Sequence, residues 1–297
     1  MNSPAFNQTI GNIAALASAC AWAAGAIFFR KLGDKASPLG MNLGKCVIGV
    51  IYLGITLLFT SFSGISIQAI MLLGVSGLLG IALADTFFFK ALIDLGPRQI
   101  LMLETLSPVF TVILAISFLG ERPQAASWLG MLLILAGTGA VLWEHSQKER
   151  INKRKFTGIK YAILFVICNS LGIILAKIAV VSISALQATF IRLLWGVIGL
   201  SIWGGITRQL KEWVSPFKDI KTLKLMLLSA FIVIFGGFLL SIAALKYTSA
   251  SIATILNSTT PLFILPLSAI FFKEKISFSK IISAGLVVAG VVLLICT

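Results

Sequence analysis

Four ionisable side chains lie inside long apolar segments of this chain, and they are the residues best suited to chemistry. They are Lys45, Asp85, Glu104 and Arg192. A charged side chain at the middle of a membrane span costs about 2.5–3.5 kcal/mol on insertion scales. Such a residue therefore faces a partner or water rather than lipid. These four residues are candidates for substrate binding or proton coupling.

Glu104 is the strongest candidate because it stands four residues before Pro108. A proline inside a helix leaves the carbonyl of residue i−4 without its donor, and Pro261 stands in the same relation to Asn257. Each helix would combine a kink, a freed carbonyl and a polar side chain, as the midplane sites of transporters do. The alternative is structural: hydroxyls refill the gap, and Glu104 pairs with a neighbouring cation. We favour a functional Glu104, whereas both interpretations stay open for Asn257.

The two buried cations have three possible roles. Lys45 and Arg192 either neutralise the two carboxylates, hold an anionic group of a substrate, or extend to the lipid headgroups from near the span ends. Asp85 would face a central cavity between the helices. Alternatively it would lie near the rim of that cavity, because Lys90 follows five residues later near the end of the span.

Trp22 and Asn169 complete the set of candidate residues. They lie near the middle of two further apolar segments. An aromatic ring and an amide would suit an amphipathic ligand, although a lone tryptophan in a helix bundle is more often a packing residue.

The residues needed for most enzyme chemistry are scarce. The chain has one histidine, and its four cysteines lie in apolar segments without metal-type spacing. One histidine is too few for a His-based metal site, and no pattern in the sequence indicates a Ser-His-Asp triad. We therefore expect no metal, no cofactor and no enzymatic activity.

The elements that position these residues are apolar segments of membrane-spanning length. Hydrophobic residues make up 58% of the 297 residues and charged residues only 11%, and a span needs roughly 20 mostly apolar residues. We predict an all-α integral membrane protein with ten transmembrane helices, at 10–29, 39–60, 70–92, 99–119, 126–143, 158–179, 185–206, 223–245, 249–272 and 278–296.

Two features of these segments predict packing or membrane contact rather than chemistry. Gly74, Gly77 and Gly80 step by three along the third span, where small residues let helices approach closely. Residues 207–222 place apolar residues at steps of three and four among Lys and Arg, which suits a helix in the membrane interface.

The chain contains an internal repeat. Residues 11–51 match 158–198 at an offset of 147, and Pro108 and Glu121 match Pro261 and Glu274 at an offset of 153. Each copy holds five spans, so the second copy must cross the bilayer in the opposite sense, as inverted repeats in transporters do. We predict repeats at 1–146 and 158–297, joined by a basic linker at 147–157.

The net charge of +14 is distributed on one side of the predicted topology. Nineteen of the 24 Lys and Arg residues fall in the loops that follow odd-numbered spans or in the first or last turn of the spans beside those loops. This bias is the positive-inside pattern, which places these loops in the cytoplasm and both termini outside. The positive charge is thus explained by the bilayer, and we expect no nucleic-acid partner.

Residues 85–137 (DTFFFKALIDLGPRQILMLETLSPVF…FLGERPQAASWLGMLLILAG) and their repeat partner resemble the drug/metabolite transporter superfamily, specifically tandem EamA-type proteins. The resemblance implies ten helices around a central cavity, with spans 5 and 10 set aside from transport. It also implies cytoplasmic termini, which conflicts with the charge bias.

We therefore expect a secondary transporter in the plasma (inner) membrane, most simply an exporter of amino acids or other small metabolites, as monomer or homodimer. Glu104, alone or with Asp85, would exchange a proton for substrate. The alternatives are a multidrug exporter and an exchanger of nucleotide-sugar or S-adenosylmethionine type.

Overall fold

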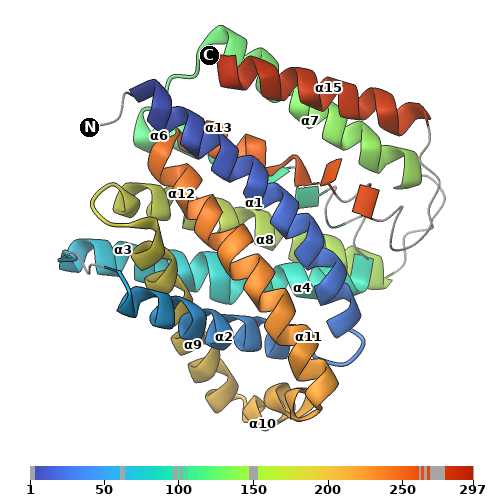
Figure 1. Ribbon diagram of the computed structural model, residues 1–297. Coiled ribbons are helices and arrows are strands. Elements are labelled where there is room, and N and C mark those ends of the chain that lie inside the picture. The colour runs from blue at the N-terminus through green and yellow to red at the C-terminus, as the bar shows by residue number, and fades with distance from the viewer. Residues whose placement is uncertain are drawn as a thin grey trace.

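The computed structural model is a bundle of helices (Figure 1). It describes residues 4–60, 64–95, 100, 103–104, 106–146, 153–260, 262–263, 266–267 and 278–296, and these contain helices and turns but no strand. In chain order the elements are α1 (Pro4–Leu32), α2 (Pro38–Leu58), α3 (Ile67–Gly77), η1 (Leu78–Leu83), α4 (Ala84–Leu95), α6 (Leu106–Leu119), α7 (Ala125–Ser146), α8 (Lys153–Val180), α9 (Ala185–Ile206), α10 (Leu210–Val214), η2 (Ser215–Lys218), α11 (Ile220–Phe231), η3 (Ile232–Leu239), α12 (Leu240–Tyr247), α13 (Ala250–Asn257) and α15 (Phe278–Cys296).

Six helical stretches are long and apolar enough to cross a membrane. They are Phe6–Leu32, Pro38–Leu58, Ile67–Leu95, Phe156–Val180, Ala185–Ile206 and Ile220–Tyr247. Shorter apolar helices cover Leu106–Leu119, Ala125–Gly137 and Ile282–Leu293. An all-helical membrane protein is thus confirmed. The count of ten spans stays a prediction, because parts of the predicted spans 99–119 and 249–272 lie outside the described residues.

The second helix of each predicted repeat begins at the same kind of cap. Ser37 Oγ accepts a hydrogen bond of 3.2 Å from the backbone N–H of Gly40, and Ser184 Oγ accepts one of 3.2 Å from that of Gln187. These side chains satisfy donors that a helix start leaves free. Ser37 and Ser184 match each other at the repeat offset, so both copies start this helix by the same local signal.

Two of the long helices contain a π-helical segment. η1 connects α3 to α4, and η3 connects α11 to α12. The two segments occupy matching positions in the repeats, at the predicted offset of 153. π-helical turns are rare and often occur at functional sites. Both segments contribute to the cavity described below.

The helices of the two copies pack on each other through equivalent contacts (Figure 1). α1 packs on η3 and α12, and α8 packs in the same way on η1 and α4. α2 packs on α9, while α7 and α15 pack on each other at one edge of the bundle. Each helix of the first copy thus has a partner in the second.

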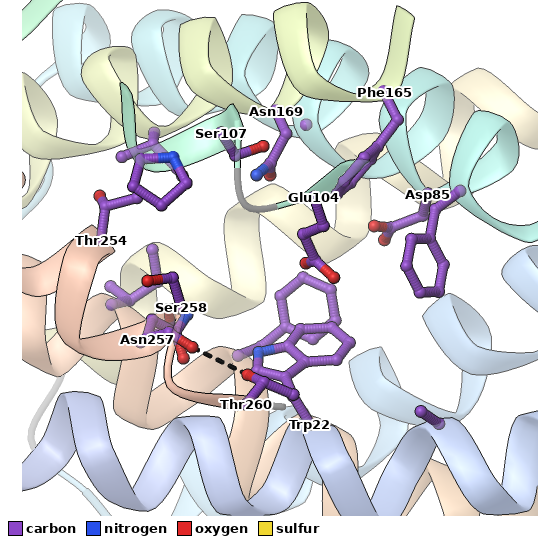
Figure 2. Close-up of a pocket in the computed structure, with 18 of the residues that line it drawn as sticks. Trp22, Asp85, Glu104, Ser107, Phe165, Asn169, Thr254, Asn257, Ser258 and Thr260 are labelled. Atoms are coloured by element: carbon purple, nitrogen blue, oxygen red, sulfur yellow. Dashed lines mark hydrogen bonds between the residues drawn. The ribbon is translucent and has the colours of Figure 1, made fainter. Parts of the chain in front are cut away.

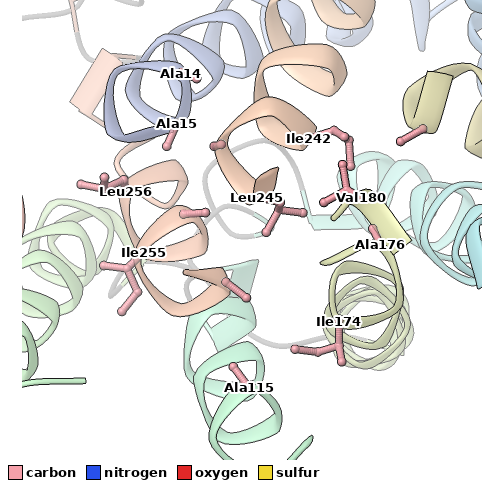
Figure 3. Close-up of a cluster of buried hydrophobic side chains, with 14 of the residues drawn as sticks. Ala14, Ala15, Ala115, Ile174, Ala176, Val180, Ile242, Leu245, Ile255 and Leu256 are labelled. Carbon is pink, nitrogen blue, oxygen red and sulfur yellow. The ribbon is translucent and has the colours of Figure 1, made fainter. Parts of the chain in front are cut away.

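The buried apolar side chains form two main clusters. The first includes Ala14 and Ala15 of α1, Ile174 and Val180 of α8, and residues of α6, α12 and α13 (Figure 3). The second includes Phe29 of α1 and residues of α2, α4, α9 and η3. Removing apolar surface from water does not drive helix association inside a bilayer, so close packing of these side chains stabilises the bundle there.

The segment 207–222 does not form one continuous helix, and its place at the membrane interface stays a prediction. It forms the short helices α10 and η2, and Trp213 is only 2% exposed. A Cβ on Gly40 would lie 2.7 Å from the Trp213 carbonyl oxygen, so the segment packs directly under the start of α2. The indole is therefore covered by protein rather than by lipid.

Candidate functional site

A central cavity lies between the helices of the two copies. Its empty volume is about 1220 Å³, including the part open to solvent. The lining residues come from both copies, and many are shown in Figure 2: Trp22, Ala26, Phe29, Lys45, Gly80, Asp85, Phe88, Phe89, Glu104, Ser107, Pro108, Phe165, Asn169, Ile173, Arg192, Phe238, Ser241, Ile242, Leu245, Thr254, Asn257, Ser258 and Thr260. Ligand pockets of proteins commonly have volumes of about 300–1,000 Å³.

The structure brings all of the predicted site residues that it describes to this cavity. Seven of them were named for substrate binding or proton coupling and one for a helix kink: Glu104, Asp85, Asn257, Lys45, Arg192, Trp22, Asn169 and Pro108. The other predicted kink residue, Pro261, lies outside the described residues. The functional roles of these side chains remain predictions.

Lys45 and Asp85 form an ion pair within the cavity wall. Lys45 Nζ donates a hydrogen bond to Asp85 Oδ2, and the Lys45 side chain is only 1% exposed. The ammonium group also lies 4.8 Å from the ring centroid of Phe238 and 5.5 Å from that of Phe89. Lys45 therefore does not extend to the headgroups, and Asp85 is not a rim residue paired with Lys90.

Arg192 is the second cation of the cavity, and its environment is different. The residue is 6% exposed, and its Nε has no hydrogen-bond partner. The ion pairs found among the described residues do not include Arg192. Arg192 and Asp85 line the same cavity, but no ion pair between them is found among the described residues. Within the described part of the chain, Arg192 is thus a buried cation that forms no ion pair.

Glu104 stands in the short helical stretch that precedes α6, and its side chain points into the cavity (Figure 2). Within the part of the chain that the structure describes, its carboxylate forms no hydrogen bond and no ion pair. Asp85 is near enough to repel it electrostatically. The described cations thus do not supply the ion pair that the structural alternative requires for Glu104.

Asn257 ends α13 and combines both interpretations left open by the sequence. Its backbone carbonyl accepts a hydrogen bond of 2.8 Å from the Thr260 hydroxyl, so a hydroxyl does refill this position. Its side-chain Nδ2 donates to Ser241 Oγ at 3.1 Å, but its buried Oδ1 has no partner. The amide oxygen therefore remains free to accept a hydrogen bond.

Sequence reasoning missed the aromatic character of the cavity. Five phenylalanines line it together with Trp22: Phe29, Phe88, Phe89, Phe165 and Phe238. The Trp22 and Phe238 rings pack edge to face, with centroids 4.9 Å apart. The signal was present in the run TFFF directly after Asp85, but the sequence of a span does not show which of its apolar residues face a cavity.

Two helices stand apart from the site. Among the described residues, none from α7 or α15 lines the cavity. In the same set, no three His, Cys, Asp or Glu side chains come together as a metal site would require.

A helical bundle with six membrane-length stretches around a charged central cavity defines a membrane transporter by its architecture. The family comparison agrees. The EamA-like transporter family matches the chain twice, over residues 9–143 and 156–296, so the chain belongs to this family.

Two further similarities extend over nearly the whole chain. An uncharacterized transporter of Archaeoglobus fulgidus is 23% identical over 282 residues, covering 94% of this chain and 96% of the relative. A protein of known crystal structure has 16% sequence identity and a TM-score of 0.71, with 95% of each chain covered. At this identity the second similarity shows the fold alone.

Proposed function

We propose that this protein is a secondary transporter that carries a small polar or amphipathic metabolite through the central cavity by alternating access. The observation that carries the proposal is the composition of the cavity wall. Lys45 and Asp85 from the first copy and Arg192 from the second meet there with Glu104, inside a bundle of membrane-length helices. Ionisable groups in such a place mark substrate or ion pathways.

The distribution of the core clusters supports an inverted relation between residues 1–146 and 158–297, joined by the linker 147–157. Along α1, the cluster of Ala14 precedes that of Phe29, whereas along α8 the cluster of Ala162 and Phe29 precedes that of Ile174. The matching helices therefore run in opposite directions between the two clusters. Rocking of two inverted halves would expose the cavity to each side in turn.

Glu104 is the proposed coupling residue. A carboxylate that lines a cavity and forms no hydrogen bond or ion pair among the described residues can take up and release a proton. In this scheme a proton enters as substrate leaves, in the inner membrane. Export of amino acids or similar metabolites is the direction and substrate class that the family resemblance suggests.

The aromatic wall supports a second candidate, a multidrug exporter. Six aromatic side chains around one cavity would accommodate flat apolar compounds. This candidate predicts that unrelated cationic compounds compete for transport. An exchanger of nucleotide-sugar or S-adenosylmethionine type has no observation of its own in its favour.

Transport by the purified protein in proteoliposomes tests these proposals. Radiolabelled amino acids and nucleotides would be offered with and without a pH gradient, and cationic dyes would be added as competitors. Saturable flux driven by the gradient is expected for wild type and lost in Glu104→Gln. Glu212→Gln, an exposed residue outside the cavity, is the matched control. Flux in Glu104→Gln that still follows the gradient would overturn the coupling role.

A further inference from the structure

The charges of the cavity do not balance by direct pairing. Lys45 and Asp85 neutralise each other in contact, which removes both from the groups that are free to meet a ligand. Among the residues that the structure describes, Arg192 and Glu104 have no ion-pair or hydrogen-bond partner. Because a buried charge is costly unless it is paired and hydrogen-bonded, an arginine that is 6% exposed with an unsatisfied Nε lacks the partner that would compensate its burial.

A glycine of the π-helical segment fixes where this guanidinium lies. A Cβ built on Gly80 would lie 2.9 Å from Nη2 of Arg192. A Cβ on Gly77, one turn earlier, would overlap the Arg192 backbone carbonyl. The helix carrying Asp85 therefore passes directly over Arg192, and the missing side chain at Gly80 leaves the space that the guanidinium occupies. Gly80 and Arg192 both line the cavity.

On this basis we propose that Arg192 binds an oxyanion group of the transported substrate, and that Gly80 is the positioning residue for its guanidinium. The proposal rests on the transport function proposed above and narrows its substrate class. The substrate carries a carboxylate, phosphate or sulfonate at one end and an apolar, ring-sized body at the other. The planar guanidinium offers paired donors that match such oxyanions.

The aromatic wall receives the rest of the molecule. Trp22 and Phe238 form an edge-to-face pair, and Phe88 and Phe165 form a second aromatic pair with centroids 5.3 Å apart. All four rings line the same cavity as Arg192. Lys45 is assigned no part in anion binding, because its side chain is only 1% exposed and its charge is neutralised by Asp85.

Binding of small aromatic probes to the purified protein in detergent tests the charge preference. Benzoate, phenyl phosphate and benzyltrimethylammonium share one ring and differ in charge, and calorimetry or thermal stabilisation would report their binding. Wild type is expected to bind benzoate or phenyl phosphate at least tenfold more tightly than the cation. The better of the two anions identifies carboxylate or phosphate as the natural group. Tighter binding of the cation, or equal binding of all three probes, would overturn the proposal.

Variants then assign the site. Arg192→Gln should weaken binding of the anions about tenfold or more, the loss expected for charge-assisted hydrogen bonds, with no effect on the cation. Arg192→Lys should recover part of the lost anion affinity, because lysine keeps the positive charge but lacks the paired N–H donors of the guanidinium. Lys211→Gln, at an exposed position, is the control. Unchanged anion binding in a folded Arg192→Gln protein would refute the role of Arg192.

Gly80→Ala keeps the proposal testable if Arg192→Gln fails to fold. The added methyl meets the far end of a flexible side chain, so the guanidinium rather than the backbone is expected to move. Anion affinity should fall several-fold in Gly80→Ala but not in Gly285→Ala, where a Cβ meets no atom within 4 Å. Equal anion affinity in these two variants would refute the positioning role. Anion binding without transport of any compound would sink the transport function alone, whereas transport of cations that benzoate does not inhibit would sink the oxyanion site alone.

Discussion

Glu121 Oε1 accepts a hydrogen bond of 2.6 Å from the backbone N–H of Ala250, a residue 129 positions later in the chain. Its other oxygen accepts from the backbone N–H of Ser251 at 3.1 Å and from the Ser251 hydroxyl at 2.6 Å. The turn that follows α6, in the first copy, thus caps the start of α13, in the second. A carboxylate at a helix N-terminus satisfies free donors and complements the helix dipole.

Substitution of Glu121 should therefore loosen the contact between the two copies. Glu121→Ala removes three accepted hydrogen bonds and is expected to lower the free energy of unfolding by about 1–3 kcal/mol, because the amide donors of α13 lose their partner. Thermal unfolding in detergent would measure the loss. Glu212→Ala, in the exposed part of α10, should change stability by no more than about 0.5 kcal/mol. Equal stability of the two variants would mean that Glu121 does not join the copies.

The ion pair of Lys45 and Asp85 predicts strong coupling between two substitutions. Lys45→Met leaves the Asp85 carboxylate unpaired, and Asp85→Asn leaves the buried Lys45 ammonium without its counter-charge. Each substitution is expected to lower the free energy of unfolding by about 3–5 kcal/mol. The double variant should cost much less than the sum, because no charge remains alone. A thermodynamic cycle built from the unfolding of the four proteins measures this coupling.

A surface pair provides the comparison for that cycle. Arg30 and Asp34 approach to 3.8 Å but are 47% and 74% exposed. Since exposed pairs contribute about 0–1 kcal/mol, Asp34→Asn should be nearly neutral. Additive costs for Lys45→Met and Asp85→Asn would show that the buried pair does not hold in solution.

The close contact of α8 with the helix formed by α3 and η1 predicts a strict size limit at Gly172. A Cβ there would lie 2.9 Å from Gly80 Cα and 3.3 Å from the carbonyl oxygen of Ser76, both of which are backbone atoms. The Ser76 hydroxyl also donates a hydrogen bond of 2.6 Å to the Gly172 carbonyl. Gly172→Ala should therefore destabilise the protein by about 1–3 kcal/mol through overpacking.

The matched substitution for this test is Gly285→Ala in α15, which meets open space. Alanine is favoured over glycine in a helix interior by about 0.5–1 kcal/mol, so this variant should be neutral or slightly more stable. Thermal unfolding of both variants separates the effect of steric overlap between helices from the effect of helix propensity. A neutral Gly172→Ala would argue against close packing of these helices.

Residue type and spacing were sufficient to predict which ionisable side chains would be kept from lipid, while their roles in a site stay predictions. Burying an ionisable side chain in a bilayer is so costly that Lys45, Asp85, Glu104 and Arg192 had few possible positions, and all four line one cavity. The repeat offset likewise predicted that helices would be equivalent in pairs. Ser37 and Ser184 show this at the level of a single hydrogen bond.

Other features depend on contacts that no local pattern encodes. The sequence left open whether Lys45 pairs with a carboxylate or extends to the headgroups, because that depends on where α2 meets α4. The sequence indicated only a packing role for Gly80. Its proposed second role, positioning the Arg192 guanidinium, depends on its distance from that group in the structure. Trp213 had the periodicity of an interfacial helix, yet Gly204 leaves space for its indole and Gly40 leaves space for its backbone.

The orientation in the membrane is the point on which charge and family resemblance disagree. If the positive-inside pattern holds, the loop containing α10 faces the cytoplasm and the turn between α8 and α9 faces outward. Both sites offer exposed positions for single cysteines, Lys211 in the first and Val181, which is 75% exposed, in the second. Each cysteine would be introduced into a variant without the native cysteines and expressed in intact cells. A membrane-impermeant thiol reagent should label Val181→Cys in intact cells, and Lys211→Cys only after the membrane is permeabilised. The reverse result would place both termini in the cytoplasm, because these two loops lie on opposite sides whichever way the protein is inserted.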